Sequence, residues 1–378
     1  MSRSIAPGNL LAHLLVPWLC LLAFGVIMVG SASVALDGGY LGKHLLYLVL
    51  ALVAFAAAFA FPTTWLANLY WLAWLAAVVA AVLVLLPGIG HEVNGAQRWI
   101  RLGGFTVQAS EVCKFGVAVF LAGYLARHYE RIRGEPTVLF VPVCAITLIA
   151  ALLIAEPDFG SAVVILTASI LVLFLAGAQV RYFLAMGLLG VAAFAALVYD
   201  APYRLERFIA FLDPWSVAYG SGYQLTQALI AFGRGELTGL GLGEGIQKLY
   251  YLPEAHNDFI FAVVAEELGS IGAIGLTLLL GYLVWRLYGL GRVFLRDEHM
   301  FAGFFCYFVA LIFGLQLMVS LGVNTGVLPT KGLTLPFVSY GGNSLIICCA
   351  LLAVVTRAYC NHYIFTPAAE PRKRRGRK

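Results

Sequence analysis

Apolar residues fall into long runs separated by short polar segments, and this pattern predicts membrane-spanning helices. Each run extends over about 17 to 25 residues, the length that an α-helix needs to cross a bilayer. The alternating short segments of an outer-membrane barrel are missing from the sequence. We place about ten spans, near residues 12–34, 44–61, 68–86, 109–127, 138–154, 159–176, 182–199, 258–285, 300–320 and 342–363.

The composition agrees with this pattern. Hydrophobic residues make up 62% of the 378 positions and charged residues 11%, and the mean hydropathy of +0.91 is far from that of a soluble globular domain. Because hydrocarbon offers no hydrogen-bond partners, the backbone of each span must satisfy itself as a helix. The fold class is therefore an all-α, polytopic membrane protein, with one transmembrane domain over residues 1–366 and a basic tail over 367–378.

Neither the cysteines nor the N-terminal apolar run indicates a secreted protein. The seven cysteines show no disulfide or zinc spacing and lie within or beside apolar runs, so they are interpreted as small core residues. The run from Leu10 to Gly30 resembles a signal peptide but is too long for one. It is predicted to be a retained first helix.

The distribution of charge indicates the orientation. An even number of spans puts both termini on one side, and that side would hold nine cations before the tail is counted, against five in the opposite short loops. Basic loops stay in the cytoplasm, so we expect both termini there, in the bacterial cytoplasmic membrane. The terminal run 372–378 would then lie beside anionic lipid or dock a partner, although a solvated tail is the simpler interpretation.

Two outward segments are too patterned to be simple connectors. The loop over about 200–257 is rich in glycine and carries an amphipathic piece from Tyr223 to Phe232. Structureless loops of this length are uncommon, so we expect short interfacial or re-entrant helices in it. The segment 321–342 combines Pro and Gly with apolar residues. Irregular backbone of that kind needs cover from protein or a water-filled cavity.

Polar side chains collect on the predicted outer side and suggest an electrostatically active cavity. Glu254, His256 and Asp258 stand at the mouth of an apolar segment, where an ionisable group is by default a functional candidate, with helix capping as the alternative. Glu111 and Lys114 are three residues apart, a spacing that suggests an ordinary ion pair on a helix surface. The other members are Arg98, Arg101, Glu156, Asp158, Asp213, Gln224, Lys331 and Ser339.

Several common kinds of site are absent from the sequence. There is no GxxxxGK[ST] motif, and the glycine-rich string 239–243 follows no predicted strand. There is likewise no HExxH motif, no Cys/His metal cluster and no recognisable Ser-His-Asp set. Nucleotide hydrolysis, structural zinc, serine hydrolysis and nucleic-acid binding are therefore not predicted.

Several blocks of the sequence, in order, resemble one family. The blocks are NGAQRWIRLGGFTVQASEVCK at 94–114, FLDPW at 211–215, GSGYQLTQALIAFGRGELTGLGLGEGIQK at 220–248, LPEAHNDFIFAVVAEELG at 252–269 and LPTKGLTLPFVSYGGNS at 328–344. They look like the signatures of the SEDS proteins, which act in bacterial shape, elongation, division and sporulation. The Pro-Glu-Ala-His and Pro-Thr-Lys-Gly variants resemble the division branch more than the elongation branch.

This resemblance implies a ten-helix peptidoglycan glycosyltransferase. Such an enzyme polymerises lipid II on the outer face of the membrane, at the division septum, beside a class B penicillin-binding transpeptidase (FtsI-type) and other division proteins. Family chemistry places the essential carboxylate on Asp258. The sequence departs from the family where Asn257 replaces the common Thr and Asn343 replaces the common Ser, which affects only fine positioning.

The residues fit this chemistry. Asp258 is expected to be the base that takes the proton from the acceptor sugar, with Arg98, Lys114 and Lys331 holding the leaving diphosphate. The predicted substrate-binding residues besides these three are Glu111, Asp158, Gln224, Glu254, His256 and Ser339. No cofactor is required by the sequence, although a divalent cation (Mg²⁺ or Mn²⁺) would suit the diphosphate.

Three alternatives remain open from sequence. A lipid II flippase would also carry polar groups around broken helices, but it needs them at mid-membrane, where Glu266 and Glu267 are the only acids predicted. A structural scaffold would tolerate loss of Asp258. An elongation polymerase would differ from the division enzyme only in the motif variants.

Overall fold

The computed structural model describes most of the chain. The described residues are 7–36, 38–93, 96–103, 105–132, 134–185, 187–188, 190, 211–329 and 332–364. Lys331, the tail 367–378, the loop residues 200–210 and most of the predicted span 182–199 lie outside them.

Helices dominate the described residues, and nine of the ten predicted spans coincide with one. They are α1 (Pro7–Ala32), α2 (Tyr40–Ala60), α4 (Tyr70–Leu85), α5 (Ala109–Ile132), α6 (Pro136–Ala155), α7 (Phe159–Leu175), α11 (Ile260–Arg296), α12 (Met300–Asn324) and α13 (Gly342–Tyr363). Seven of them are long and apolar enough to cross a bilayer, while α4 and α7 are shorter apolar helices of 16 and 17 residues. The protein is a polytopic helical membrane protein; the full count of ten spans remains a prediction.

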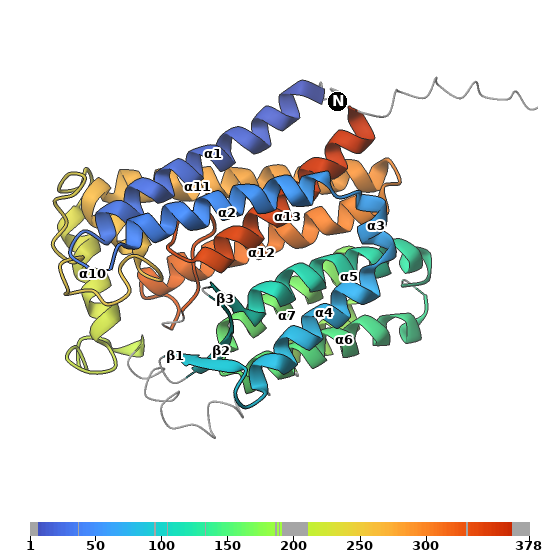
Figure 1. Ribbon diagram of the computed structural model, residues 1–378, viewed down its shortest axis with the longest axis horizontal. Helices are drawn as coiled ribbons and strands as arrows, with labels where there is room; N and C mark the ends of the chain where they lie inside the picture. Colours follow the sequence, from blue (N-terminus) through green and yellow to red (C-terminus); the bar gives the residue numbers. More distant parts are fainter. Residues whose placement is uncertain are drawn as a thin grey trace, which may run out of the picture.

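Two further helices are not membrane spans. The short α3 (Thr63–Asn68) joins α2 to α4, and α10 (Tyr223–Gly235) covers the amphipathic piece of the long loop. In Figure 1, α10 lies at the end of the bundle opposite to the N-terminus. It packs mainly on α11, so the long loop is anchored on the membrane domain.

A small sheet at the same end of the bundle was not expected from the sequence. Strands β1 (Gly90–Val93), β2 (Ala96–Leu102) and β3 (Phe105–Gln108) form an antiparallel sheet in the order β1-β2-β3. Ile100 of β2 is buried and packs with Val84 and Ala109. Arg98 and Arg101 therefore belong to a strand rather than to an irregular connector, and the all-α class describes only the membrane part.

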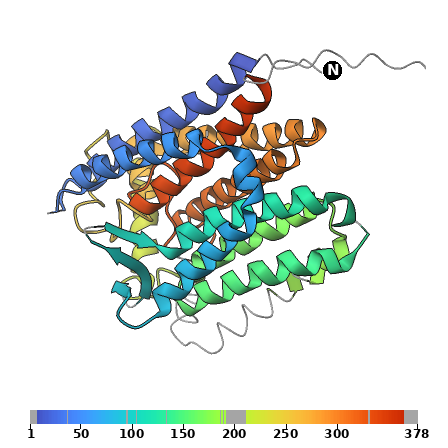
Figure 2. The ribbon, with the colours of Figure 1, turned by 45° about the vertical axis from the view of Figure 1, so that its right-hand side comes forward.

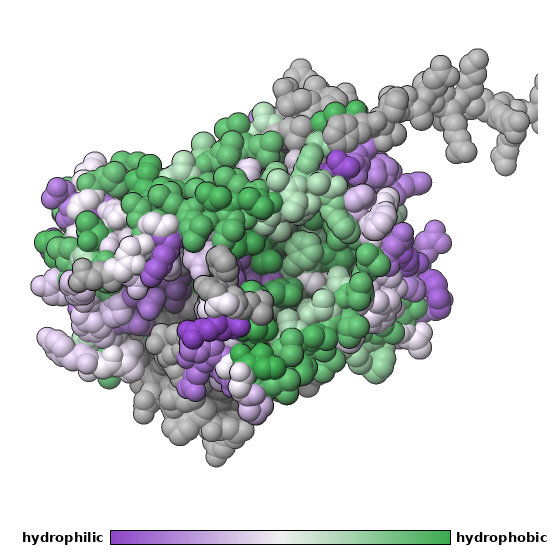
Figure 3. Space-filling view, viewed as in Figure 1, coloured by the Kyte–Doolittle hydropathy of each residue, from purple (hydrophilic) through white to green (hydrophobic). Residues whose placement is uncertain are grey.

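Two groups of helices make up the bundle, as Figures 1 and 2 show. One contains α1, α2, α11, α12 and α13, and the other contains α4 to α7; α5 and α12 pack against each other between them. Apolar side chains form a broad band across the middle of the face in Figure 3, with hydrophilic residues at both ends. This band matches the hydrocarbon layer that the sequence predicts.

Glycine allows the loop before α13 to enter the bundle. A Cβ added at Gly25 of α1 would stand 2.6 Å from the carbonyl oxygen of Phe337. Only a residue without a side chain permits this approach of a helix to irregular backbone. The segment 332–341, predicted to need protein cover, is thus packed on α1 and carries buried Phe337 and Val338.

Candidate active site

Asp258 stands just before α11, and a buried asparagine fixes its backbone. Asn324, the last residue of α12, donates from Nδ2 to the Asp258 carbonyl oxygen (3.1 Å) and accepts at Oδ1 from the Ala262 amide (3.1 Å). Asn324 is fully buried. The end of α12 therefore holds the start of α11 through one side chain.

The segment 332–341 closes on Asp258 from the other side. Ser339 donates from Oγ to the Asn257 carbonyl oxygen (2.8 Å) and accepts from the Leu335 amide (2.9 Å). A Cβ added at Gly332 would lie 2.8 Å from Oδ2 of Asp258. Two blocks about 80 residues apart in sequence thus meet at the Asp258 carboxyl group, and the Ser339 hydroxyl joins them.

The imidazole of His256 is enclosed by aromatic rings. Its centroid lies 4.6 Å from that of Tyr40 and 5.3 Å from that of Tyr340, whose amide donates to the His256 carbonyl oxygen (2.9 Å). Burial lowers the pKa of His256, and the nearby Glu254 carboxylate only partly opposes this. The neutral ring therefore packs between the two tyrosines, and its Nδ1 has no hydrogen-bond partner among the described residues.

The surroundings of Asp258 favour a carboxyl group that titrates near neutrality. Burial, assisted by the Glu254 carboxylate and opposed by Arg98, raises the pKa of Asp258 to about 7. Glu254 itself is exposed and sits at a positive φ of 55°. A carboxyl group with such a pKa can lose and regain a proton at physiological pH, as a general base must.

Arg98 and Asp158 come to the site from the sheet and from the link between α6 and α7. Arg98 donates from Nη2 to the Pro157 carbonyl oxygen. Asp158 accepts from the Ser161 amide at the start of α7 and from the Gln108 side chain, both at 3.4 Å. Arg98 lies on β2 and Gln108 on β3, so both strands donate a hydrogen bond to the link between α6 and α7.

Glu111 and Lys114 form a buried ion pair inside the bundle, which corrects the expectation of a helix-surface pair. Nζ of Lys114 lies 2.6 Å from Oε1 of Glu111, and both side chains are at most 5% exposed. Oε2 of Glu111 has no hydrogen-bond partner among the described residues. The pair sits in the first two turns of α5, which begins directly after β3.

Two further predicted residues, Gln224 and Lys331, are not joined to Asp258 by a described contact. Gln224 lies in the first turn of α10, and no described contact joins it to Asp258. Lys331 lies outside the described residues, next to Gly332. Arg98, Asp158, Glu254, His256, Asp258 and Ser339 are thus the members of the predicted set that the described contacts and electrostatic interactions gather around one loop.

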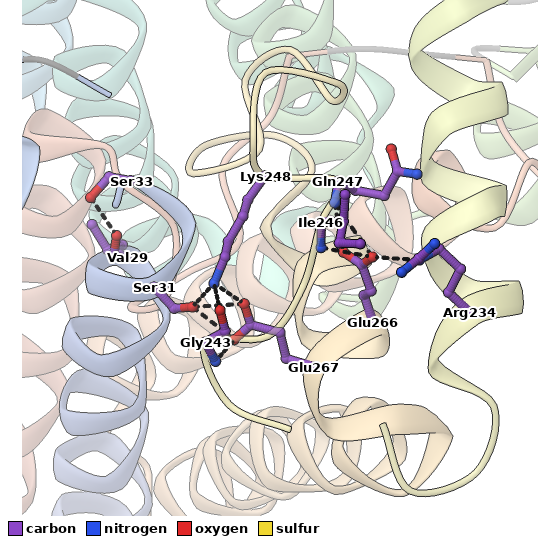
Figure 4. A network of polar contacts seen from close by, with 10 residues as sticks. All are labelled: Val29, Ser31, Ser33, Arg234, Gly243, Ile246, Gln247, Lys248, Glu266 and Glu267. Atoms are coloured by element: carbon purple, nitrogen blue, oxygen red, sulfur yellow. Dashed lines mark hydrogen bonds and ion pairs between the residues drawn. The ribbon is translucent and has the colours of Figure 1, made fainter. Parts of the chain in front are cut away.

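A second polar network holds the long loop to α11 through Glu266 (Figure 4). Arg234 of α10 donates from Nε to Oε1 of Glu266 (3.0 Å), and the amides of Ile246 and Gln247 donate to the same carboxylate at 3.1 Å. Glu266 is completely buried. Its negative charge therefore has a cation and two backbone donors, the partners that a buried carboxylate needs.

The adjacent Glu267 makes the same kind of anchor with different partners. Lys248 donates from Nζ to Oε1 (2.6 Å), Ser31 of α1 donates from Oγ (2.7 Å), and the Gly243 amide donates to Oε2 (3.0 Å). Glu266, Glu267 and their six partners, hereafter the loop anchor, fasten residues 243–248 to α11 and α1. The chain continues from Lys248 to Asp258, so the anchor lies directly before the site.

Some of these residues were absent from the sequence-based site. Asn324 and Gln108 gave no signal stronger than a polar residue near the end of an apolar run or strand. Glu266 and Glu267 were noted as unusual acids, but their partners are 19 to 236 residues away in sequence. Side-chain pairing over such separations depends on the fold, which spacing alone does not supply.

Comparisons with known proteins agree on one family. The family model described as "Cell cycle protein", covering FtsW, RodA and SpoVE, matches residues 12–363. Proteins named "Probable peptidoglycan glycosyltransferase FtsW" from Hahella chejuensis and Methylococcus capsulatus are each 46% identical to this chain; the matches cover 90% and 89% of it and 87% and 86% of the relatives.

Solved structures give the same result. A chain from a peptidoglycan synthase complex, described for the coordination of polymerisation and crosslinking, superposes with a TM-score of 0.77 at 29% identity, over 93% of this chain and 98% of that one. The Thermus thermophilus rod shape determining protein RodA superposes with a TM-score of 0.70 at 28% identity, over 93% and 97%. The chain therefore belongs to the FtsW/RodA/SpoVE family of cell cycle proteins, the SEDS family, and stands closest to its FtsW branch.

Proposed function

We propose that this protein is the peptidoglycan glycosyltransferase of septal wall synthesis, which polymerises lipid II into glycan strands at the outer surface of the bacterial inner membrane. The names of its FtsW relatives and the family model support the reaction class. The observation that carries the proposal is Asp258, whose carboxyl group has a pKa of about 7, with Arg98 close enough to oppose that shift.

Asp258 acts as the general base in this mechanism. Its carboxylate takes the proton from the 4-hydroxyl of the acceptor GlcNAc, and the resulting oxygen attacks C1 of the donor MurNAc. The bond between C1 and the phosphate oxygen breaks, and the polyprenyl diphosphate leaves with the electron pair. One attack from the side opposite to the leaving group inverts the configuration at C1. One carboxyl group suffices, because a diphosphate needs less protonation than a sugar leaving group.

Arg98 is the described cation best placed to stabilise the departing diphosphate. Its Nη2 is taken by the Pro157 carbonyl oxygen, but Nε has no partner among the described residues. A guanidinium can hold phosphate oxygens through two parallel hydrogen bonds. Lys114 contributes charge from its pair with Glu111, and Lys331 follows from the sequence alone.

A divalent cation is a separate proposal. Among the described residues, no group of three or more His, Cys, Asp or Glu side chains could hold a metal ion. A Mg²⁺ or Mn²⁺ ion would therefore have to arrive on the diphosphate of the substrate, with most of its ligands from phosphate and water. Polymerisation with and without a chelator, followed by readdition of each metal, tests this proposal.

The partner assignment also rests on similarity. The solved peptidoglycan synthase complex coordinates polymerisation with crosslinking, which supports a class B penicillin-binding transpeptidase as the partner of this chain. With Asp258 on the outer surface, both termini face the cytoplasm, and the complex works at the division septum.

Polymerisation of purified lipid II, with and without the transpeptidase, tests the function. Asp258→Asn should slow glycan formation by about 10²- to 10⁴-fold, the usual contribution of a general base. Glu135→Gln is the matched control, because Glu135 forms an exposed ion pair with Arg131 near the predicted cytoplasmic end of α5. A folded Asp258→Asn protein with the wild-type rate would disprove the base. Translocation of lipid II without any glycan product would favour a flippase.

A further inference from the structure

Glu156 is the most unusual carboxyl group near the site. The sequence places it in the outer polar set, but neither the predicted substrate-binding residues nor the proposed mechanism includes it. It is fully buried (0% exposed) at the end of α6. Neither of its carboxyl oxygens has a hydrogen-bond partner among the described residues. An ionised carboxylate in that position would be costly, because buried charges need paired or hydrogen-bonded partners.

The two residues that follow Glu156, Pro157 and Asp158, accept hydrogen bonds from the sheet. The carbonyl oxygen of Pro157 accepts from Arg98, and the side chain of Asp158 accepts from Gln108 and the Ser161 amide. Glu156 is thus positioned by the same contacts that hold Arg98, although its own side chain makes none of them.

The donor that would suit Glu156 is the unused one on Arg98. Nε of Arg98 is buried and has no partner among the described residues, as is the case for both oxygens of Glu156. The two groups interact electrostatically, since Arg98 opposes the rise in the pKa of Glu156. A free donor and a free acceptor therefore stand near each other beside the Asp258 loop.

We propose that Glu156 is a positioning residue that acts through Arg98: as a neutral acid it leaves the guanidinium free for the substrate diphosphate, and as a carboxylate it pairs with Arg98 and withdraws it. The inference rests on the proposed function, in which Arg98 receives the leaving group. The proton released by Glu156 goes to solvent, and no bond of the substrate changes in this step.

The groups around Glu156 favour its neutral form near pH 7. Burial, assisted by the Asp158 carboxylate and opposed by Arg98, raises the pKa of Glu156 to about 8. Asp158 lies on the same link and Arg98 on β2, while Cys113 of α5 is within electrostatic range. Arg98 is therefore the charged neighbour that favours the carboxylate form of Glu156. That carboxylate would in turn neutralise the charge of Arg98.

The test compares the pH dependence of lipid II polymerisation by the wild-type complex and by Glu156→Gln, which is permanently neutral and close in shape. At pH 7 the two rates should agree within about twofold. At pH 9 the wild type should be about tenfold slower than Glu156→Gln, because a group with a pKa of about 8 is then only about one-tenth protonated. Glu135→Gln, the exposed control, should keep the wild-type profile.

Infrared spectroscopy supplies a readout independent of activity. The C=O stretch of a protonated carboxylic acid should be present in the wild type at pH 7.5 and weaker in Glu156→Gln. A folded Glu156→Gln protein that is inactive at every pH, or that loses rate above pH 8 as the wild type does, would overturn the inference. Either result leaves the proposed function standing, since that depends on the wild type and on Asp258→Asn.

Discussion

At the scale of single residues, Asp258 owes its expected reactivity to burial rather than to any special partner. Its carboxyl group has Gly332 beside it and Asn324 on its backbone carbonyl oxygen. Desolvation is the largest cause of its raised pKa, and it penalises the charged form. The protein therefore provides a base that titrates near neutral pH, and among the described residues no ion pair joins its carboxylate to a cation.

This gives a prediction for the acidic limb of the pH profile. Only the ionised carboxylate of Asp258 accepts a proton, and its pKa is about 7. The polymerisation rate at saturating lipid II should therefore rise about tenfold between pH 5 and pH 6 and stop rising between pH 7 and pH 8, where the decline expected from ionisation of Glu156 begins. The rate should be measured in buffers of constant ionic strength. A flat profile from pH 5 to 7 would show that another group sets the rate.

The buried pair of Glu111 and Lys114 permits stability and activity to be separated. Lys114→Met leaves the Glu111 carboxylate without its cation, which should lower the stability by about 3–5 kcal/mol. The double variant Lys114→Met/Glu111→Leu should recover most of the thermal stability, because neither charge remains. If Lys114 grips the diphosphate, the double variant stays slow in polymerisation. Recovery of both properties would assign the pair to structure alone.

At the scale of elements, the spans could be predicted because bilayer thickness sets their length. The sheet could not, since β2 has only seven residues and the order Arg98, Trp99, Ile100, Arg101 does not alternate between polar and apolar side chains. The site likewise has a part that the sequence predicts and a part that it does not. Asp258 and its neighbours in the LPEAHND block could be named from sequence, whereas the hydrogen bonds of Asn324 and Ser339 depend on how distant segments pack.

Gly269 interrupts α11 and brings it close to the long loop. It has φ 68° and ψ −172°, and a Cβ there would stand 2.3 Å from the carbonyl oxygen of Leu237. Its neighbour is thus the backbone of the long loop, whereas a Cβ at Gly275 would point into open space.

The loop anchor should matter more than a surface pair of equal geometry. In both Lys248–Glu267 and Arg131–Glu135 the N–O distance is 2.6 Å, but the first pair is at most 1% exposed and the second about half exposed. Glu267→Gln should therefore lower the melting temperature clearly and make residues 236–251 sensitive to protease, whereas Glu135→Gln changes little. Equal effects of the two variants would show that the anchor contributes no more than an exposed pair.

At the scale of the whole molecule, the orientation makes a labelling prediction. Tyr219 is fully exposed in the long loop, and Arg131 is exposed at the opposite end of the bundle. In a background without native reactive thiols, Tyr219→Cys should react with a membrane-impermeant maleimide in intact spheroplasts. Arg131→Cys should react only after permeabilisation. The reverse pattern would put Asp258 in the cytoplasm and end the proposed mechanism.

The contacts of Ser31 bear on how the protein is made. Ser31 lies in the last turn of the first helix, yet its hydroxyl hydrogen-bonds with Lys248 and Glu267, which follow 217 and 236 residues later. A chain emerging from the ribosome begins with its N-terminal part. The end of the first helix must therefore remain in the membrane without these contacts until most of the polypeptide has been translated. A truncated chain that stops before Lys248 would leave this end of α1 without both partners.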